Sequence, residues 1–100
     1  MSKKLDDFLR SFRNYIHKEL IELQKFKIQM EIDKYHVGIN LKYTYKISIM
    51  SYRDGSSMVT YQIKERPEDI YTENNVSIYN IPSMTIKFAV DYENGKYKKG

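Results

Sequence analysis

The longest regular pattern of apolar and polar positions runs from Val37 to Ile49. Every odd position in this stretch is apolar or tyrosine, and every even position is polar or glycine. A period of two residues is typical of a half-buried β-strand, whose side chains point alternately to the two faces of a sheet. The pattern therefore predicts one long strand over residues 37–52, with one apolar and one polar face.

A helical period governs the N-terminal quarter of the chain. Spacings of three and four residues separate its apolar positions, which predicts an amphipathic helix over residues 3–24. The stripe consists of Leu5, Leu9, Phe12, Ile16, Leu20 and Leu23.

The period changes to two between Phe26 and Ile32, and this change favours a strand at 26–32. A helix that continues to Asp33 is the competing interpretation. In both cases a turn at 33–36 leads into the long strand.

Turn residues punctuate the middle of the chain. Residues 53–57 contain the Asp-Gly pair that is typical of a β-hairpin, and they predict a return strand over 58–64. Pro67 is expected to end that strand. The segment 65–75 is interpreted as an acidic loop or a short helical turn.

The C-terminal third contains two further apolar runs. A weak strand is expected at 76–81, and Pro82 marks an edge or a break because proline cannot donate to a strand ladder. Alternation from Met84 to Tyr92 predicts a final strand.

Together these elements predict a single α+β domain. The domain is expected to span residues 1–95, followed by a basic, frayed tail at 96–100, and a chain of 100 residues suits one domain. The sheet is a curled antiparallel one of four or five strands. One long N-terminal amphipathic helix packs on one of its faces, because the apolar face of a sheet needs cover.

The composition excludes several classes of chemistry. The chain has no cysteine, which removes disulfides, thiolate chemistry and Cys-ligated zinc. No apolar run approaches the roughly 20 residues that cross a bilayer, and the N-terminus lacks the long apolar segment of a secretory signal. These features predict a cytoplasmic protein without a membrane partner.

The sequence contains no recognisable catalytic motif. It has no Gly-x-Ser-x-Gly elbow, and its four glycines form no phosphate-binding loop. His17 and His36 have no companions at metal-ligating spacing. Glu31 and Asp33 share a polar strand face, but nothing in the sequence builds a pocket around them for acid–base chemistry. We therefore expect neither an enzyme nor a cofactor or metal.

Ten tyrosines raise the question of nucleobase stacking on an open sheet. Parity argues against that role, because the strand tyrosines share the apolar face with isoleucine and valine. The high β-propensity of tyrosine accounts for its abundance. We expect the following tyrosines to belong to the core or its rim: Tyr43, Tyr45, Tyr61 and Tyr92.

The net charge of +4 is unevenly distributed. Residues 34–64 carry five basic side chains against one acidic one, whereas 65–79 carry four acidic against one basic. Parity places lysines among amides and hydroxyls on the polar sheet face, which suits an acidic protein surface or a phosphate backbone. Only four of the basic residues are arginine, which disfavours base reading.

These observations favour a small non-enzymatic binding protein that docks on a larger protein. The missing motifs, the small size and a Lys-, Ile-, Tyr- and Asn-rich composition typical of AT-rich genomes suggest a phage- or mobile-element-encoded inhibitor of a host nucleic-acid-processing protein. The predicted contact residues lie on the polar sheet face, the hairpin and the acidic segment: Lys42, Lys46, Lys64, Lys87, Arg53, Asp54, Glu68 and Asp69.

Two alternatives remain open. The first is a direct DNA- or RNA-binding module that uses the basic sheet face. The second, an enzyme with a pocket between helix and sheet, is the least favoured. A long edge strand also offers a route to a homodimer.

Overall fold

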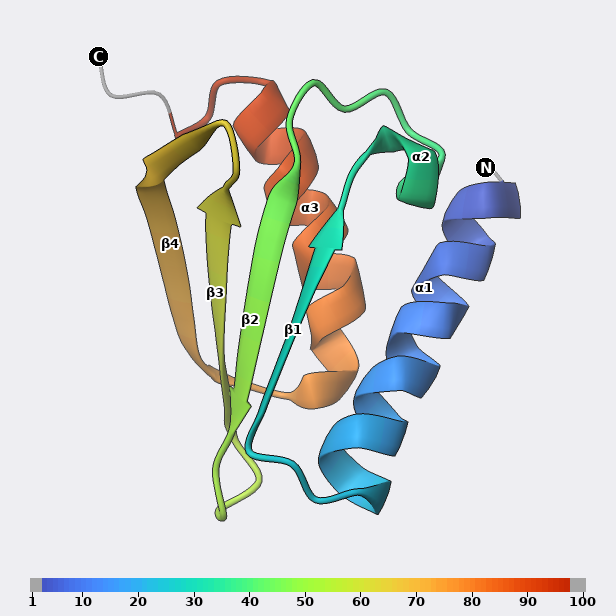
Figure 1. The fold of residues 1–100 in the computed structure, drawn as a ribbon, viewed down its shortest axis with the longest axis vertical. Coiled ribbons are helices and arrows are strands. Elements are labelled where there is room, and N and C mark those ends of the chain that lie inside the picture. The colour runs from blue at the N-terminus through green and yellow to red at the C-terminus, as the bar shows by residue number, and fades with distance from the viewer. Residues whose placement is uncertain (1–2, 98–100) are drawn as a thin grey trace.

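The computed structural model describes residues 3–97 and has two layers, a four-stranded antiparallel sheet and the helices that cover one of its faces (Figure 1). The strand order follows the chain, β1-β2-β3-β4. The strands are β1 (Lys27–Ile32), β2 (Tyr45–Ser51), β3 (Ser57–Ile63) and β4 (Arg66–Val76). The helices are α1 (Lys3–Ile16), its π-helical continuation η1 (His17–Glu22), α2 (Lys34–Val37), the short 3₁₀ helix η2 (Ile78–Asn80) and α3 (Ile81–Glu93). The predicted α+β class, with an N-terminal helix on an antiparallel sheet, is confirmed.

The N-terminal helix and the strand after it agree with their periodicity. Phe12, Ile16 and Leu20 are buried at four-residue spacing, which turns the apolar stripe of α1 and η1 toward the sheet. The helical segment ends before Gln24, whose φ of 52° is left-handed. β1 begins at Lys27, so the competing helix to Asp33 is wrong.

The strand predicted over 37–52 is shorter in the structure and begins at Tyr45. Residues 34–37 form α2 instead, because the Asp33 side chain accepts hydrogen bonds from the backbone N–H groups of Tyr35 and His36 and caps this short helix. Gly38, with a φ of 71°, ends the helix in the left-handed conformation that glycine adopts easily.

Side chains from distant elements hold the loop between α2 and β2. Glu93 accepts hydrogen bonds from the backbone N–H groups of Lys42 and Tyr43, and Glu65 accepts one from Thr44. These N–H groups therefore need no strand partner. Val37 and Leu41 are nevertheless buried, which explains why the loop continues the alternating pattern.

The predicted acidic loop at 65–75 is wrong, because residues 66–76 form the edge strand β4. A bulge accommodates Pro67, since Ile63 pairs with Arg66 and Gln62 pairs with Ile70, which leaves the three residues between them without partners. An edge strand tolerates proline and charge better than a central one.

The C-terminal third is helical, so the strands predicted at 76–81 and 84–92 are wrong. The Ser77 side chain accepts from the Tyr79 N–H at the start of η2, and Pro82 lies in the first turn of α3, where its missing N–H costs nothing. The buried residues of α3 follow a helical period: Ile81, Pro82, Thr85, Phe88, Ala89 and Tyr92.

Two residues of the predicted tail make contacts. Lys96 Nζ lies 3.4 Å from Asp91 Oδ2, and the Tyr97 ring packs on Tyr71 with centroids 4.9 Å apart. The remaining tail residues, 98–100, lie outside the described residues.

Candidate functional site

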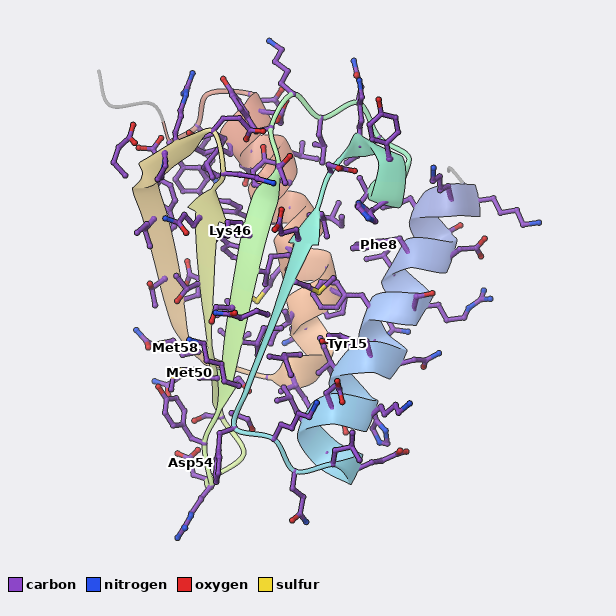
Figure 2. All side chains as sticks on the ribbon, viewed as in Figure 1. Phe8, Tyr15, Lys46, Met50, Asp54 and Met58 are labelled. Atoms are coloured by element: carbon purple, nitrogen blue, oxygen red, sulfur yellow. The ribbon has the colours of Figure 1, made fainter. Side chains whose placement is uncertain are left out.

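Helices bury one face of the sheet, and no helix within residues 3–97 covers the other. On the inner face, alternate residues of β2 and β3 are buried against the helices, as their parity predicted. Lys46, Met50 and Met58 have the opposite parity and project from the uncovered face (Figure 2). We call this surface the open face, and register and parity assign to it Lys27, Gln29, Glu31, Lys46, Ser48, Met50, Met58, Thr60, Gln62, Ile70 and Thr72.

Strand register arranges the open face in three rows. Directly paired residues of an antiparallel sheet have Cβ atoms about 5 Å apart, so each row is continuous across the strands. The first row is Glu31, Lys46, Gln62 and Ile70; the second is Gln29, Ser48, Thr60 and Thr72; the third is Lys27, Met50 and Met58. A charged row thus lies beside a row of hydroxyls and amides, and a partly apolar row follows.

A shallow hollow of about 430 Å³ lies on this surface, between the first and second rows. Its polar lining supplies both hydrogen-bond donors and acceptors. Part of the lining is held in place, because Gln62 Nε2 donates to the Pro67 carbonyl at 2.8 Å and the Thr60 and Thr72 hydroxyls lie 3.4 Å apart. The hollow is lined by Gln29, Met30, Glu31, Lys46, Ile47, Ser48, Thr60 and Gln62.

The open face is less basic than the sequence predicted. Lys64, the residue after β3, forms an exposed ion pair with Glu31, with Nζ 3.4 Å from Oε1. Lys27 and Lys46 have no carboxylate within 4.0 Å in the described part of the chain. Two unpaired ammonium groups therefore remain on this surface.

Lys42 and Lys87 do not lie on the open face, which corrects the grouping of all these lysines on one sheet surface. Lys42 belongs to the loop before β2, and Lys87 lies on α3, 2.8 Å from Asp91 Oδ2. That contact lowers the pKa of Asp91. The grouping failed because strand parity was extended through segments that form a loop and a helix.

The other predicted contact residues also separate in space. Arg53 and Asp54 form the tip of the β2–β3 hairpin, which the Asp-Gly pair correctly predicted. Asp54 accepts hydrogen bonds from the Ser56 hydroxyl at 2.6 Å and the Ser56 N–H at 2.9 Å, and these lower its pKa. Glu68 and Asp69 belong to the β4 bulge. Of the eight predicted contact residues, only Lys46 and Lys64 border the open face.

The sequence reasoning missed the apolar side chains of this face. Met50 and Met58 are direct partners in the β2–β3 ladder, and the Tyr52 hydroxyl lies 3.8 Å from Met58 Sδ. Ile70, on β4, is 54% exposed. The alternation of 58–64 carried the signal for Met58, whereas nothing pointed to Ile70 because its segment was interpreted as a loop.

A second cavity, of about 360 Å³, lies where the loop before β2, the start of β4 and the end of α3 meet. The Arg66 guanidinium lies 4.8 Å from the centroid of the Tyr43 ring. The Tyr92 hydroxyl donates to Asp69 Oδ2 at 2.5 Å and lies 3.5 Å from Arg66 Nη1, which donates to it. We call this cavity the aromatic pocket; it is lined by Lys42, Tyr43, Arg66, Asp69, Tyr71, Tyr92, Glu93, Gly95 and Tyr97.

Burial raises the pKa of two phenols at the aromatic pocket. Burial and the hydrogen bond to Asp69 raise the pKa of Tyr92 to about 12. Burial, followed by the hydrogen bond to Glu93, also raises the pKa of the adjacent Tyr45. Among residues 3–97 no three His, Asp or Glu side chains gather in a group that could hold a metal ion.

Comparisons with protein-family models, curated proteins and solved structures found no significant match to this chain. Within the described helices, none is long and apolar enough to cross a bilayer.

Proposed function

We propose that this chain is a non-enzymatic binding protein whose open face docks on a carboxylate-bearing surface of a larger protein. One observation carries the proposal: helices cover one side of the sheet, and the other presents the unpaired Lys27 and Lys46 beside a hydroxyl–amide row and the Met50–Met58 pair. Protein interfaces combine such apolar contacts, with methionine enriched, and a polar rim.

The charges of the open face support a protein partner over a nucleic acid. A protein that makes six to ten phosphate contacts needs a comparable number of cationic groups. Among residues 3–97, the open face has two unpaired lysines and no arginine, and a third lysine at its border, Lys64, is paired with Glu31. Lysines on a mixed polar surface instead give orientation and specificity against a complementary acidic surface.

The size and composition of the chain support a narrower form of this proposal. In this form the partner is a host nucleic-acid-processing protein, and a phage or mobile element encodes the chain to block it. The blocking step needs only occupancy of the partner surface, which is consistent with a chain whose sequence contains no catalytic motif.

The test compares an open-face variant with a matched control. Lys46→Glu combined with Met58→Gln alters the charged and the apolar rows, whereas Lys18→Glu makes the same charge change on η1, away from this face. Affinity capture from the native host should recover a protein with the unaltered chain and with Lys18→Glu, and lose it with the double variant. Circular dichroism establishes that all three chains fold. Recovery of the same partner by the folded double variant would overturn the proposal.

A second measurement separates the nucleic-acid alternative. The capture is repeated with nuclease, and fluorescence anisotropy is recorded with single- and double-stranded DNA and RNA at low salt. We expect a nuclease-resistant partner and no nucleic-acid binding. Binding that weakens steeply with salt would support the phosphate-binding alternative and contradict ours.

A further inference from the structure

The aromatic pocket is built from three elements that are far apart in the sequence and lies away from the hollow on the open face. Its volume of about 360 Å³ lies at the small end of the ~300–1,000 Å³ typical of small-molecule sites. The loop before β2 contributes Tyr43, β4 contributes Arg66 and Tyr71, and the C-terminal end of α3 with the turn after it contributes Tyr92 and Tyr97.

Four tyrosine rings give this pocket aromatic walls. The rings of Tyr43 and Tyr92 meet edge to face with centroids 5.6 Å apart, and those of Tyr71 and Tyr97 lie 4.9 Å apart. No hydrogen bond within residues 3–97 uses the hydroxyl of Tyr43, Tyr71 or Tyr97, and none of these oxygens is a buried unpaired atom. Such walls suit a planar ring, and their hydroxyls can donate to its polar edge.

The carboxylates of the pocket are already engaged by the protein. Glu93 accepts three hydrogen bonds, from the backbone N–H groups of Lys42 and Tyr43 and from the Tyr45 hydroxyl, with lengths of 2.8, 3.2 and 2.7 Å. Asp69 accepts a hydrogen bond from the Tyr92 hydroxyl. These hydrogen bonds occupy both oxygens of Glu93 and one oxygen of Asp69, and they hold the pocket together.

The two cationic side chains of the pocket, by contrast, form no ion pair within residues 3–97. Neither the Lys42 ammonium nor the Arg66 guanidinium has a carboxylate within 4.0 Å in the part of the chain that the structure describes. The Tyr43 ring positions the guanidinium, and only one of its N–H groups reaches Tyr92. An arginine placed in this way can bind phosphate or carboxylate in bidentate fashion.

We infer that the aromatic pocket binds a small anion with a planar ring, of the nucleoside monophosphate class. The ring packs against the tyrosines, and the phosphate lies between Arg66 and Lys42. This site does not depend on the docking of the open face, so either proposal can fail alone.

The full chain is labelled with ¹⁵N and titrated separately with AMP, adenosine and inorganic phosphate. Amide chemical shifts report binding. AMP should shift the signals of Tyr43, Arg66 and Gly95. Adenosine and phosphate should each bind at least about tenfold more weakly, because each lacks one of the two contacts, and tenfold corresponds to 1.4 kcal/mol. Absence of AMP-induced shifts at the pocket would overturn the inference.

Two variants and a control identify the contacts. Arg66→Gln removes the exposed guanidinium and Tyr43→Leu removes one wall, whereas Arg53→Gln removes the same charge at the hairpin tip. We expect the AMP affinity to fall about tenfold in each pocket variant and to stay unchanged in Arg53→Gln. An equal loss in Arg53→Gln and Arg66→Gln would identify binding by net charge alone and overturn the inference. Thermal unfolding of each variant establishes that the fold is intact.

Discussion

The Tyr45 hydroxyl donates a hydrogen bond of 2.7 Å to Glu93 Oε2, which joins the first residue of β2 to the last residue of α3. Glu93 also accepts hydrogen bonds from the backbone N–H groups of Lys42 and Tyr43. One carboxylate therefore satisfies a buried phenol and two loop amides, and it ties the sheet to the C-terminal helix at the wall of the aromatic pocket.

Glu93→Ala should lower the free energy of unfolding by about 2 kcal/mol, because hydrogen bonds to a charged group contribute roughly 1.5–3 kcal/mol. Tyr45→Phe should cost less, since Glu93 keeps both backbone donors. Urea unfolding measures both changes. The exposed Glu68→Ala serves as the control and should stay within about 0.5 kcal/mol of the unaltered chain. An equal effect of Glu68→Ala and Glu93→Ala would refute this role of Glu93.

Alkaline pH should destabilise the fold through its buried phenols. Burial raises the pKa of Tyr61 to about 12, and burial together with Asp69 does the same for Tyr92. In each case the pKa in the folded chain lies above the value near 10 in the unfolded chain. The stability that the protonated phenols contribute is therefore fully present below about pH 10, and it is lost as the pH rises through about 12. Urea unfolding at several pH values should show a shallower alkaline decline for Tyr92→Phe. The exposed Tyr79→Phe should leave the decline unchanged, and a change there equal to that of Tyr92→Phe would contradict the assignment.

Ser57→Ala should leave stability unchanged or raise it by up to about 1 kcal/mol, because a buried hydroxyl without a partner carries an uncompensated desolvation cost. The Ser57 side chain is 0% exposed, and its Oγ has no hydrogen-bond partner within residues 3–97. Ser56→Ala provides the comparison, since the Ser56 hydroxyl donates to Asp54 at 2.6 Å, and it should destabilise. Urea midpoints measure both. A clear loss of stability in Ser57→Ala would show that this hydroxyl has a partner in solution.

Gly38→Ala should be more destabilising than Gly55→Ala. Both glycines have positive φ, at 71° and 89°, where an alanine costs about 1–2 kcal/mol. A Cβ at Gly38 would also lie 2.8 Å from Lys4 Cβ on α1, whereas no atom lies within 4 Å of one at Gly55. The difference between the two melting temperatures therefore reports the close approach of α1 and α2. Equal melting temperatures would mean that this approach does not constrain the fold.

The candidate site was only partly predictable. Parity correctly placed Lys46, Gln29 and Ser48 on the polar face of the sheet, because alternation is a local property of each strand. It could not exclude Lys42 and Lys87, whose positions depend on a loop and a helix that continue the same alternation. The aromatic pocket was not predicted, since its residues converge only after α3 packs against β4.

The sequence by itself determined the elements whose signals are local. The stripe of α1, the change of period at β1 and the Asp-Gly hairpin each depend on neighbouring residues alone. Tertiary structure decided the rest. Glu93 and Glu65 determine where β2 begins, through hydrogen bonds from distant parts of the chain. β4 forms because β3 offers it a partner.

The C-terminal helix shows this most clearly. Phe88 and Tyr92 fit both the alternation of a strand and the four-residue spacing of a helix, so the local pattern was ambiguous. The sheet's apolar face resolves it, because Phe88 stacks on Tyr61 with centroids 4.4 Å apart while Ala89 and Thr85 are buried beside it. Only a helix can bury all of these residues at once, and that requirement exists only after β2 and β3 have formed the face that α3 covers.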